Sequence, residues 1–561
     1  MARSPFHRIL SRVAQATRVS HIANVPLDVA WHQLEERRAR GIRRRDILKA
    51  AGVFAVAPLL KACPPLPPPP GNKTVGIVGA GMAGLHCAYR LKGLGIVATV
   101  FEAQTRNGGR LLTDRTTFAD PDGQHCELGG ELVDTPHLTM HDLREELGLD
   151  FYDYSVDTGV STDYVFFDGA SVPISDVLTA FAPLASRFDT DVTAADATAN
   201  DFATLDALSI RDYFDQLVGE TLVVDDNIAL RMLDVAYNIE YGREIEEQSA
   251  LNLLYLIGTS TDRLEAFGPS DELFHTVQGN DSFISRLAAA IDGQIQNGKL
   301  LTKIKTESDG RQTLSFDDGA EQTFDEVVVS LPFTMLREVD LTEATLSDEK
   351  RFAIDNIGYG TNAKLMLGFS SRPWRDSYAS NGSSYADLAY QATWETSRLQ
   401  PGTQGILTNY VGGEHGLDVG NGTPESQAAA AVADLEVVWP GTAAAFNNKV
   451  ARFHWPTNPF VKASYACYLP GQWSTIFGNE GLPEGSLKFC GEHSSEEFQG
   501  FMEGAAETGA RAALEVADAL GAESGQALMA DGPQARILAR ARAKVGTRPR
   551  RRTRRRRART T

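Results

Sequence analysis

Between residues 75 and 101 the spacing of apolar residues changes from a continuous run to helical spacing and back again. Residues 75–78 form a short apolar run, which is typical of a buried parallel strand. Residues 82–94 carry apolar side chains at helical spacing, and residues 96–101 form a second apolar run. The order of strand, helix and strand predicts a βαβ unit with a tight turn after its first strand.

The same two patterns organise the rest of the chain. Residues 487–490 form another apolar strand, and a helix rich in Ala and Leu begins at about Met502. Helical spacing predicts several helices within residues 200–275, and short apolar segments predict a mixed sheet within residues 336–485.

The turn of the predicted βαβ unit carries three glycines in the sequence GAGMAG. We expect Gly79 to allow the tight bend, Gly81 to let the backbone approach a pyrophosphate, and Gly84 to permit close packing of helix on strand. An acid, Glu102, lies 18 residues after Gly84. That is about the position, roughly 20 residues on, at which an acid accepts hydrogen bonds from an adenosine ribose. Together these features predict a bound dinucleotide.

Three longer segments resemble a known family. They are EAQTRNGGR at residues 102–110, ELGGELVD at residues 127–134, and the segment SLKFCGEHSSEEFQGFMEGAAETG that begins at Ser486. The sequence here resembles the FAD-dependent amine oxidases, which include monoamine oxidases, polyamine oxidases and L-amino acid oxidases. The resemblance covers roughly residues 73–520, and motifs almost 400 residues apart would close around the two ends of one FAD.

The resemblance implies a set of cofactor-binding residues. Arg110 would lie along the pyrophosphate and flavin, Ile304 on the adenine side, and Glu492 near the ribityl or phosphate groups. The amide of Met502 would face the flavin pyrimidine edge, where a helix N-terminus stabilises negative charge. The full set is Gly79, Gly81, Met82, Ala83, Gly84, Glu102, Ala103, Arg110, Gly129, Gly130, Glu131, Ile304, Glu492, Phe501 and Met502.

A lysine interrupts the apolar strand predicted within residues 359–374. Strand alternation places Lys364 on the same face as Met366, and burying an ammonium there is costly unless it finds water or a partner. The resemblance implies that Lys364 is catalytic: it would hold a water against the reactive ring nitrogen of the flavin and assist reoxidation by dioxygen. It further implies that Tyr465 and Phe501 form two aromatic walls in front of the flavin.

The cysteines bear on how FAD is held. In monoamine oxidases the residue before this tyrosine is a cysteine bonded to the flavin, whereas this chain has Ser464 there and a cysteine only at Cys467. We therefore expect non-covalent FAD. The five cysteines of the chain show no CxxC pair and no metal-ligand spacing, so no metal site is predicted.

These features predict oxidation of an amine or an L-amino acid at its C–N bond. The imine would be hydrolysed to a keto acid or aldehyde plus ammonia or a smaller amine, and dioxygen would become hydrogen peroxide. Apolar walls keep the reacting amine neutral. The substrate class stays open, because Glu131 either attracts a cationic substrate end or braces the flavin loop. Arg243 is a candidate clamp for a carboxylate.

Three alternatives compete with this interpretation. A polyamine oxidase is the alternative within the same family. A desaturase or porphyrinogen oxidase of similar fold would keep the glycines and Glu102 but would need neither Lys364 nor the aromatic pair. A non-catalytic flavin-binding protein would be yellow, but amines would not bleach it in the absence of air.

The predicted fold is an α/β flavoprotein of two discontinuous domains. A Rossmann-like FAD-binding domain would comprise residues 72–150, 276–335 and 486–525, and an α+β substrate domain would comprise residues 151–275 and 336–485.

The N-terminal segment predicts export. RRRDILKAAGVFAVAPLLKAC has arginines before an apolar run that is too short for a bilayer-spanning helix of about 20 residues. It resembles a twin-arginine export signal over residues 1–63, which predicts a periplasmic, membrane-anchored or secreted protein. LKAC loosely resembles a lipoprotein processing site, so anchoring through Cys63 is one of these outcomes. Residues 64–71 form a Pro-rich linker.

Charge is unevenly distributed over the chain. The net charge is −19, while residues 1–49 carry +7 and residues 536–561 carry +13, which leaves about −39 for the body between them. Such a body repels nucleic acid, so no nucleic-acid partner is expected. Its charge would either draw in cationic substrates or simply form a solvated acidic surface, and the second interpretation is preferred. The basic segment of residues 526–561 is predicted to be disordered.

Overall fold

The computed structural model describes residues 73–161, 164–218, 226–522 and 533–547. The predicted export signal, Cys63 and the Pro-rich linker lie outside the described residues.

A five-stranded parallel sheet contains the dinucleotide-type turn. Its strand order is β19 (Leu487–Phe489), β13 (Glu326–Val329), β1 (Val75–Val78), β2 (Ala98–Glu102) and β9 (Ile295–Asn297), and every pairing is parallel. The predicted strands at residues 75–78 and 487–490 are confirmed, and the second strand of the βαβ unit begins two residues later than expected.

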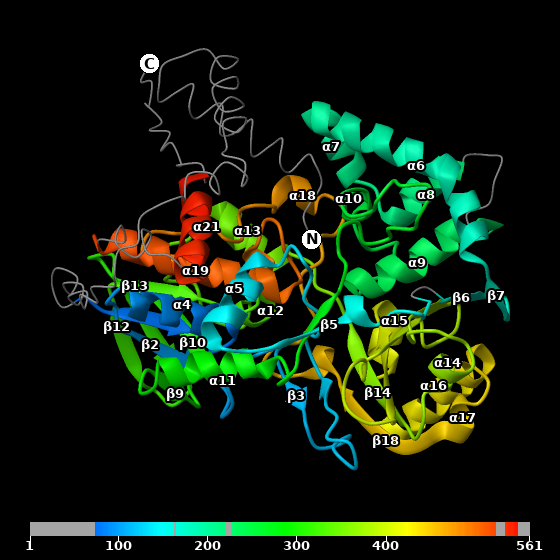
Figure 1. Cartoon of the computed structure of the whole chain (residues 1–561). Coiled ribbons are helices and arrows are strands. Elements are labelled where there is room, and N and C mark those ends of the chain that lie inside the picture. The colour runs from blue at the N-terminus through cyan, green and yellow to red at the C-terminus, as the bar shows by residue number, and fades with distance from the viewer. Residues whose placement is uncertain (1–72, 162–163, 219–225, 523–532, 548–561) are drawn as a thin grey trace, which may run out of the picture.

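Helices cover one face of this sheet and a small antiparallel sheet covers the other (Figure 1). Val75 and Ile77 pack in one core with the first set, which is α4 (Met82–Gly93), α5 (Leu138–Leu147), α11 (Asp281–Ala290) and α19 (Met502–Ala519). The second set is β10 (Leu301–Thr306), β11 (Gln312–Phe316) and β12 (Glu321–Phe324). Across that face the Phe101 ring lies 4.6 Å from Phe316 and 5.8 Å from Phe324, between ring centroids.

A seven-stranded mixed sheet forms the second half of the molecule. Its order is β18 (Phe446–Phe453), β14 (Ala363–Phe369), β17 (Gly405–Val411), β16 (Ala392–Glu395), β15 (Ser384–Ala386), β6 (Tyr164–Phe167) and β7 (Ala170–Val172). On β14, Leu365 and Leu367 pack in one hydrophobic core and Met366 in another. The alternation predicted for this strand is therefore confirmed.

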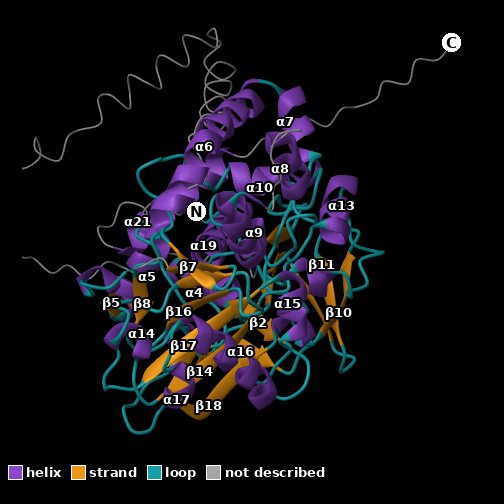
Figure 2. Cartoon of the chain, turned by 90° about the vertical axis from the view of Figure 1, so that its right-hand side faces the viewer, coloured by secondary structure: helices purple, strands orange, loops and turns teal. Residues whose placement is uncertain are grey.

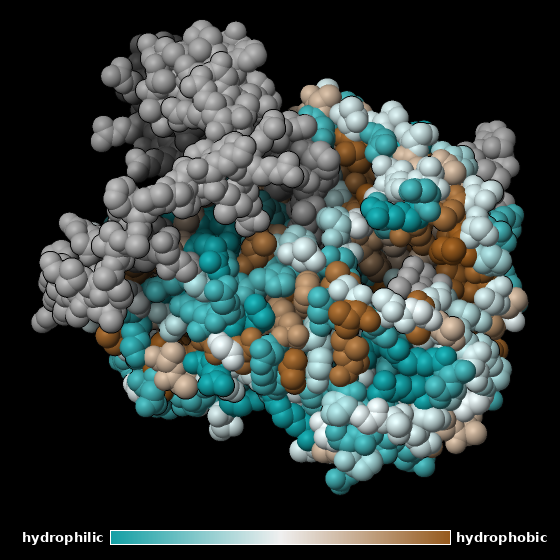
Figure 3. Space-filling view, in the orientation of Figure 1, coloured by the Kyte–Doolittle hydropathy of each residue, from teal (hydrophilic) through white to brown (hydrophobic). Residues whose placement is uncertain are grey.

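Helices lie on both sides of the mixed sheet, and Figures 1 and 2 show the two groups at opposite ends of this half. One group is α14 (Pro373–Asp376), α16 (Pro424–Val438) and α17 (Thr442–Ala445), while α15 (Gly413–Asp418) lies between the two groups. The other is α6 (Ile174–Ala197), α7 (Ala199–Asp206), α8 (Ile210–Val218), α9 (Ile228–Tyr241) and α10 (Ala250–Leu254). On the face drawn in Figure 3, hydrophobic side chains show mainly among the helices of the second group.

Shorter elements connect these layers. They are β3 (Thr113–Asp114), β4 (Cys126–Glu127), β5 (Phe151–Asp153), β8 (Phe274–Thr276), α12 (Phe333–Leu336), α13 (Asp348–Asn356) and α18 (Gln472–Thr475), with 3-10 turns at Tyr154–Val156, Trp455–Thr457 and Glu492–Ser494. No helix in the described part of the chain combines the length and apolarity needed to cross a membrane.

The C-terminal segment corrects one prediction. Residues 526–561 were expected to be disordered, but Pro533–Thr547 form helix α21. The reason is that apolar residues at helical spacing precede the run of arginines: Ile537 is buried in the core beside α19. Arg540 pairs with Asp142 on α5, so the basic side chains of α21 also meet acids of the folded body.

Candidate functional site

A cavity of about 440 Å³ lies between the two halves and is lined by both. Toward one end its walls include Glu102 of β2 and Thr302 of β10. Toward the other they include Lys364 of β14, Trp394 of β16 and Tyr410 of β17. Strand alternation explains the second wall, because these three side chains leave the mixed sheet on the face opposite its Leu-rich core.

Most of the predicted site residues meet in this cavity. Its lining includes Gly79, Gly81, Met82, Ala83, Glu102, Ala103, Arg110, Gly129, Gly130, Glu131, Lys364, Tyr465, Glu492, Phe501 and Met502. Segments more than 400 residues apart in the sequence thus contribute to one surface.

The glycine turn has the geometry that each glycine was expected to supply. Gly79 has φ +100, and a Cβ there would lie 2.5 Å from Ser330 Oγ. A Cβ on Gly84 would lie 2.0 Å from the Gly79 carbonyl oxygen, so α4 reaches the strand only because this residue has no side chain. At Gly81 the nearest atom to such a Cβ is 4.0 Å away, which leaves the backbone open to the cavity.

Two of the helices that begin at the cavity, α4 and α19, have uncapped N-termini. No side chain accepts a hydrogen bond from the first amides of α4, after Gly81, or of α19, after Phe501. Elsewhere Thr423, Ser347 and Asn227 cap α16, α13 and α9 in the usual way. Free amides and the positive end of the helix dipole make these two N-termini suitable for anionic groups of a dinucleotide.

Glu102 is held in place by the backbone around it. One carboxylate oxygen accepts the Ala80 amide at 2.9 Å and the other accepts the Gln104 amide at 3.0 Å. The carboxylate is therefore fixed at the edge of the cavity, next to the glycine turn, where an acid that binds a ribose is expected.

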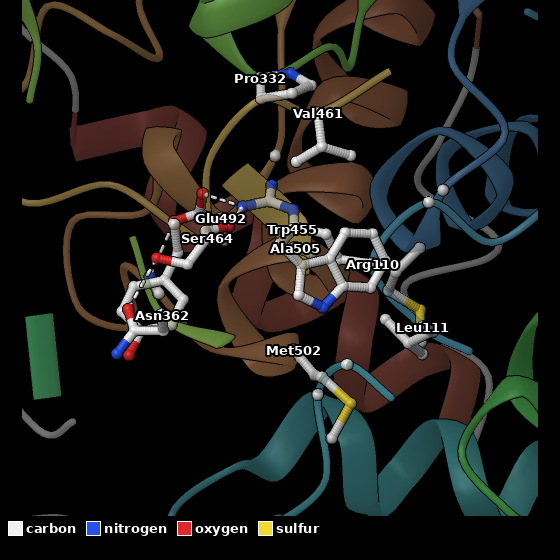
Figure 4. A pocket seen from close by; sticks show the side chains of 18 of the residues that line it. Arg110, Leu111, Pro332, Asn362, Trp455, Val461, Ser464, Glu492, Met502 and Ala505 are labelled. Atoms are coloured by element: carbon white, nitrogen blue, oxygen red, sulfur yellow. Dashed lines mark hydrogen bonds and ion pairs between the residues drawn. The ribbon is translucent and has the colours of Figure 1, made fainter. Parts of the chain in front are cut away.

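Arg110 joins the first and last motifs. Its guanidinium donates to Glu492 at 2.9 Å and to the backbone oxygen of Ser464 at 2.6 Å (Figure 4). The Ser464 hydroxyl in turn donates to Asn362 at 2.7 Å. Glu492 also accepts the Gly500 amide at 2.9 Å, which ties it to the loop before α19.

Lys364 has a buried ion-pair partner. Its ammonium lies 2.7 Å from Glu131, whose second oxygen accepts the Thr396 hydroxyl at 2.9 Å. Burial alone raises the pKa of Glu131, but the charges of Lys364 and His275 and the hydrogen bonds to the carboxylate together outweigh this, so the pKa is lowered and the acid is ionised. The ammonium also lies 5.2 Å from the centre of the Trp394 ring. Glu131 therefore braces Lys364, and its two oxygens are already engaged.

Tyr465 and Phe501 both line the cavity on the Lys364 side. The Tyr465 hydroxyl donates to the backbone oxygen of Glu240 at 2.6 Å and lies 2.8 Å from the Tyr410 hydroxyl. Burial raises the pKa of Tyr465 well above its usual value, so the phenol stays neutral. With its hydroxyl end anchored, the ring of Tyr465 is held as a wall.

Two predicted cofactor residues lie outside the lining. Gly84 packs behind the turn, as its role requires. Ile304 was expected on the adenine side, but it is buried in the core, and Thr302 of the same strand faces the cavity instead. The register of β10 shifts between Leu301 and Lys303. This irregularity changes which residues of the strand share a face, so the side chain of Ile304 lies in the core and not in the cavity lining.

Sequence reasoning missed two acids in the wall. Glu240 lies in the last turn of α9, and Glu272 lies in the loop before β8. Burial raises the pKa of each to about 8. Glu272 is solvent-accessible and borders the open volume of the cavity, so a small molecule can reach its carboxylate. No motif marks either position.

The cations of the described lining all have partners. Arg110 pairs with Glu492, Lys299 with Asp318, and Lys364 with Glu131. Arg243, the candidate carboxylate clamp, lies outside the lining.

The side chain of Arg243 donates instead to the Tyr359 backbone oxygen at 2.7 Å, and it pairs with Glu247. Among the described residues, Arg243 thus lies outside the cavity lining with its guanidinium already engaged.

A histidine and glutamate cluster lies behind Lys364 and was not expected from the sequence. Potential ligand atoms of His125, Glu127 and His275 lie within 4.8 Å of one another. Glu127 already accepts hydrogen bonds from Thr113 and the Asn280 amide, and it lies 3.0 Å from His275. These bonds account for the buried carboxylate without an ion.

Known proteins resemble this chain over most of its length. The family model described as flavin containing amine oxidoreductase matches residues 82–517. Polyamine oxidase 5 of Oryza sativa is 24% identical over 461 residues, which are 78% of this chain and 87% of the relative. An L-amino-acid oxidase of Siganus canaliculatus is 23% identical, over 79% of this chain and 85% of the relative. A longer relative from Dictyostelium discoideum is 26% identical, and the chain spans 44% of its length.

Solved structures share the fold. Cyclohexylamine oxidase from Brevibacterium oxydans superposes with a TM-score of 0.69 at 19% identity, covering 80% of this chain and 100% of that one. Putrescine oxidase bound to putrescine superposes with a TM-score of 0.67 at 18% identity, covering 80% and 99%. The two-domain α/β architecture predicted from the sequence is therefore confirmed.

Proposed function

The chain belongs to the flavin-containing amine oxidoreductase family, and from this premise we propose that it is an FAD-dependent oxidase. It oxidises the C–N bond of an amine or L-amino acid to an imine and reduces dioxygen to hydrogen peroxide. The observation that carries this proposal is that Lys364, Tyr465 and Phe501 line the same cavity as the dinucleotide turn.

The cavity suits FAD in its shape and polarity. A side chain at Gly79 or Gly84 would clash with the protein around the turn, and the uncapped N-termini of α4 and α19 offer amides at both ends of the cavity. When bound, FAD supplies the acceptor for the hydride of the substrate and the site at which dioxygen is reduced. Glu102 would hold the ribose, and the amide of Met502 would face the flavin ring.

We propose that FAD is held without a covalent bond. The position before Tyr465 is Ser464, which has no thiol and whose hydroxyl is bonded to Asn362. Cys467 is buried outside the lining, and burial raises the pKa of its thiol to about 12. Acid precipitation of the yellow protein should therefore leave all of the flavin in the supernatant. Colour that stays in the pellet would contradict a non-covalent cofactor.

The chain's own residues position the substrate and keep it reactive. Tyr465 and Phe501 form apolar walls, which disfavour the charged form of the amine and leave its lone pair free. The Lys364 ammonium, fixed by Glu131, would hold a water and stabilise negative charge near the reacting ring. The expected products are an imine and hydrogen peroxide, and water hydrolyses the imine to a carbonyl compound and ammonia or a smaller amine.

A peroxide-coupled assay of the purified yellow protein tests this function. Arylalkylamines, polyamines and L-amino acids are supplied in air, and the same compounds are added without oxygen while the flavin spectrum is recorded. Amines should bleach the flavin and then yield peroxide in air. Bleaching without peroxide would indicate a dehydrogenase, and no bleaching by any amine would favour the desaturase or the non-catalytic alternative.

We also propose that the N-terminal segment exports the folded, flavin-loaded protein. The support is the resemblance of residues 43–60 to a twin-arginine signal, and the proposal covers a periplasmic, membrane-anchored or secreted product. Replacing Arg44 and Arg45 by Lys should retain the protein in the cytoplasm of a twin-arginine-competent bacterial host. Unchanged export would contradict the signal.

A further inference from the structure

Two acids of the cavity wall differ from the other acids around them. Glu102 accepts backbone amides, and the remaining bonded acids pair with cations, namely Glu131 with Lys364, Glu338 with Lys462 and Glu492 with Arg110. Glu240 and Glu272 also line the cavity. Within the described residues, the structure gives neither of their carboxylates a hydrogen bond or an ion pair.

Glu272 has an unfavourable backbone conformation that the hydrogen bonds of its loop hold in place. Its φ is +46, a left-handed conformation that non-glycine residues seldom adopt. Its amide donates to Asp134 at 2.9 Å, and Asp134 also accepts the Ser270 hydroxyl at 2.7 Å, which fixes the loop. The loop is therefore anchored in a way that presents the carboxylate of Glu272 to the cavity.

The acids lie at the substrate end of the cavity. The backbone oxygen of Glu240 accepts the hydroxyl of Tyr465, one of the aromatic walls. Burial raises the pKa of Tyr410, and the charges of Glu240 and Glu272 add to this effect, so both acids lie within electrostatic reach of that ring. Tyr410 is paired in register with Lys364 on the neighbouring strand.

The surroundings of the pair favour a cation and disfavour an anion. The charges of Asp134, Asp271 and Glu131 repel the ionised form of Glu272, and the Lys364 ammonium opposes them. Each cation of the described lining already has an acidic partner, so a carboxylate on a substrate would meet acids without a counter-charge. An ammonium would instead satisfy two acids at once.

We propose that Glu240 and Glu272 bind a second cationic group of the substrate, so that the protein oxidises diamines or polyamines with a distal ammonium and rejects free α-amino acids. The proposal rests on the oxidase function proposed above. It assigns the choice of substrate in this chain to α9 and to the loop before β8, while the C–N bond reacts between Tyr465 and Phe501.

The pair should also make substrate binding depend on pH. Its carboxyl groups have a pKa of about 8, and the groups that face it are Asp134, Asp271, Glu131, Lys364, Tyr410 and Tyr465. An ammonium binds the ionised acids, so the KM for a diamine should fall as pH rises toward 8. A monoamine has no distal ammonium, so its KM should not depend on the ionisation of these two acids. The ratio of the two KM values therefore isolates the pH dependence that the acids cause.

The experiment measures kcat and KM for three matched substrates with the flavin-loaded protein. They are 1,4-diaminobutane, butylamine and ornithine, which has the distal ammonium and also an α-carboxylate. The wild-type protein should prefer the diamine over each of the others by about ten- to a hundredfold in kcat/KM, as expected for a charge-assisted hydrogen bond. A series from 1,3-diaminopropane to 1,8-diaminooctane then locates the best spacing.

Substitution separates binding from chemistry. E240Q and E272Q should raise the KM for the best diamine about tenfold or more, leave its kcat nearly unchanged, and leave butylamine unaffected. Glu246→Gln, at an exposed acid outside the lining, is the matched control. The flavin spectrum of each variant reports on whether the site is still assembled.

Two failures are distinguishable. Equal kcat/KM for butylamine and every diamine, or a preference for ornithine or other L-amino acids, would overturn the assignment of the acids and leave the oxidase function intact. An equal loss for butylamine and diamine in E240Q and E272Q would also overturn it. Absence of anaerobic bleaching with all amines would instead remove the oxidase function.

Discussion

The two ends of the cavity are built differently. At the cofactor end, the charged side chains of Glu102 and Arg110 have fixed partners: Glu102 accepts two amides, and Arg110 is held by Glu492 and Ser464. At the substrate end, Glu240 and Glu272 have no such partners within the described residues. The cofactor end is thus organised before anything binds. The acids of the substrate end lack a cationic partner, which a bound ligand would supply.

This difference follows from how each end is encoded. The cofactor end depends on a turn of six residues and two helix starts, where single glycines decide whether the chain fits. The substrate end is formed where α9, a loop and three strands meet. No short sequence motif is needed around its two acids. Changes at the cofactor end should therefore act on the whole protein, and changes at the substrate end on selected substrates.

The largest effect is expected at Gly84. Gly84→Ala would place a Cβ 2.0 Å from the Gly79 carbonyl oxygen, so α4 must move away from β1 and the turn must open. We expect loss of most bound flavin and of peroxide production with every substrate. The ratio of absorbance at 450 to 280 nm, a spectroscopic measure of flavin content, checks this. Gly319→Asn, in open space at φ +81, is the control, because Asn tolerates that conformation. Full flavin content in Gly84→Ala would contradict the argument.

Lys364 tests the boundary between the two ends. Lys364→Met should keep the yellow colour but slow reoxidation of the flavin by dioxygen by about a hundredfold, because a positioned charge is lost. It also leaves Glu131 buried without its cation, so the double variant with Glu131→Gln separates catalysis from stability. Stopped-flow mixing of reduced protein with oxygen measures the rate. Reoxidation at the wild-type rate in both variants would exclude the proposed role.

The acids of the substrate end should reduce stability as pH rises. Glu240 and Glu272 have a pKa of about 8 in the folded protein, against about 4.3 for a free glutamate. The unfolded chain loses these protons first, so the free energy of unfolding should fall as pH rises from about 5 to about 8.

E240Q/E272Q should remove that fall and raise Tm at pH 8, by about 1 °C for each kcal/mol recovered in a chain of this size. At pH 4, where the acids are protonated in both states, Tm should match the wild type. Thermal unfolding of the full chain across this pH range provides the measurement. A Tm gain as large at pH 4 as at pH 8 would attribute the effect to something other than ionisation.

The same contrast explains what the sequence could predict. The turn at Gly79, the strand at residues 75–78 and the face of Lys364 follow from local spacing, which the backbone obeys closely. The burial of Ile304 could not be foreseen, because the register shift in β10 depends on its partner strand. The pair of Glu240 and Glu272 was missed because nothing in either segment specifies that the two will meet.

Helix α21 shows how a strong local signal can hide a weaker one. The run of arginines after residue 547 suggested disorder for the whole segment 526–561, but the apolar spacing ahead of it was sufficient for docking. Ile537 lies in the core, and the arginines of the helix meet acids of α5. In this respect α21 resembles the cofactor end, since its charged groups have fixed partners.

The smallest effect is expected at Arg540. This arginine pairs with Asp142 at the edge of the folded body and remains partly exposed, so its contribution is limited by solvent screening. Arg540→Gln should lower the free energy of unfolding by about 1 kcal/mol or less, and 0.5 M salt should reduce that difference. Denaturant unfolding of the full chain measures it, with the exposed Arg286→Gln as control. A loss of several kcal/mol would mean that α21 is held mainly by charge, whereas Leu538→Ala should cost about 2–5 kcal/mol because its side chain is fully buried.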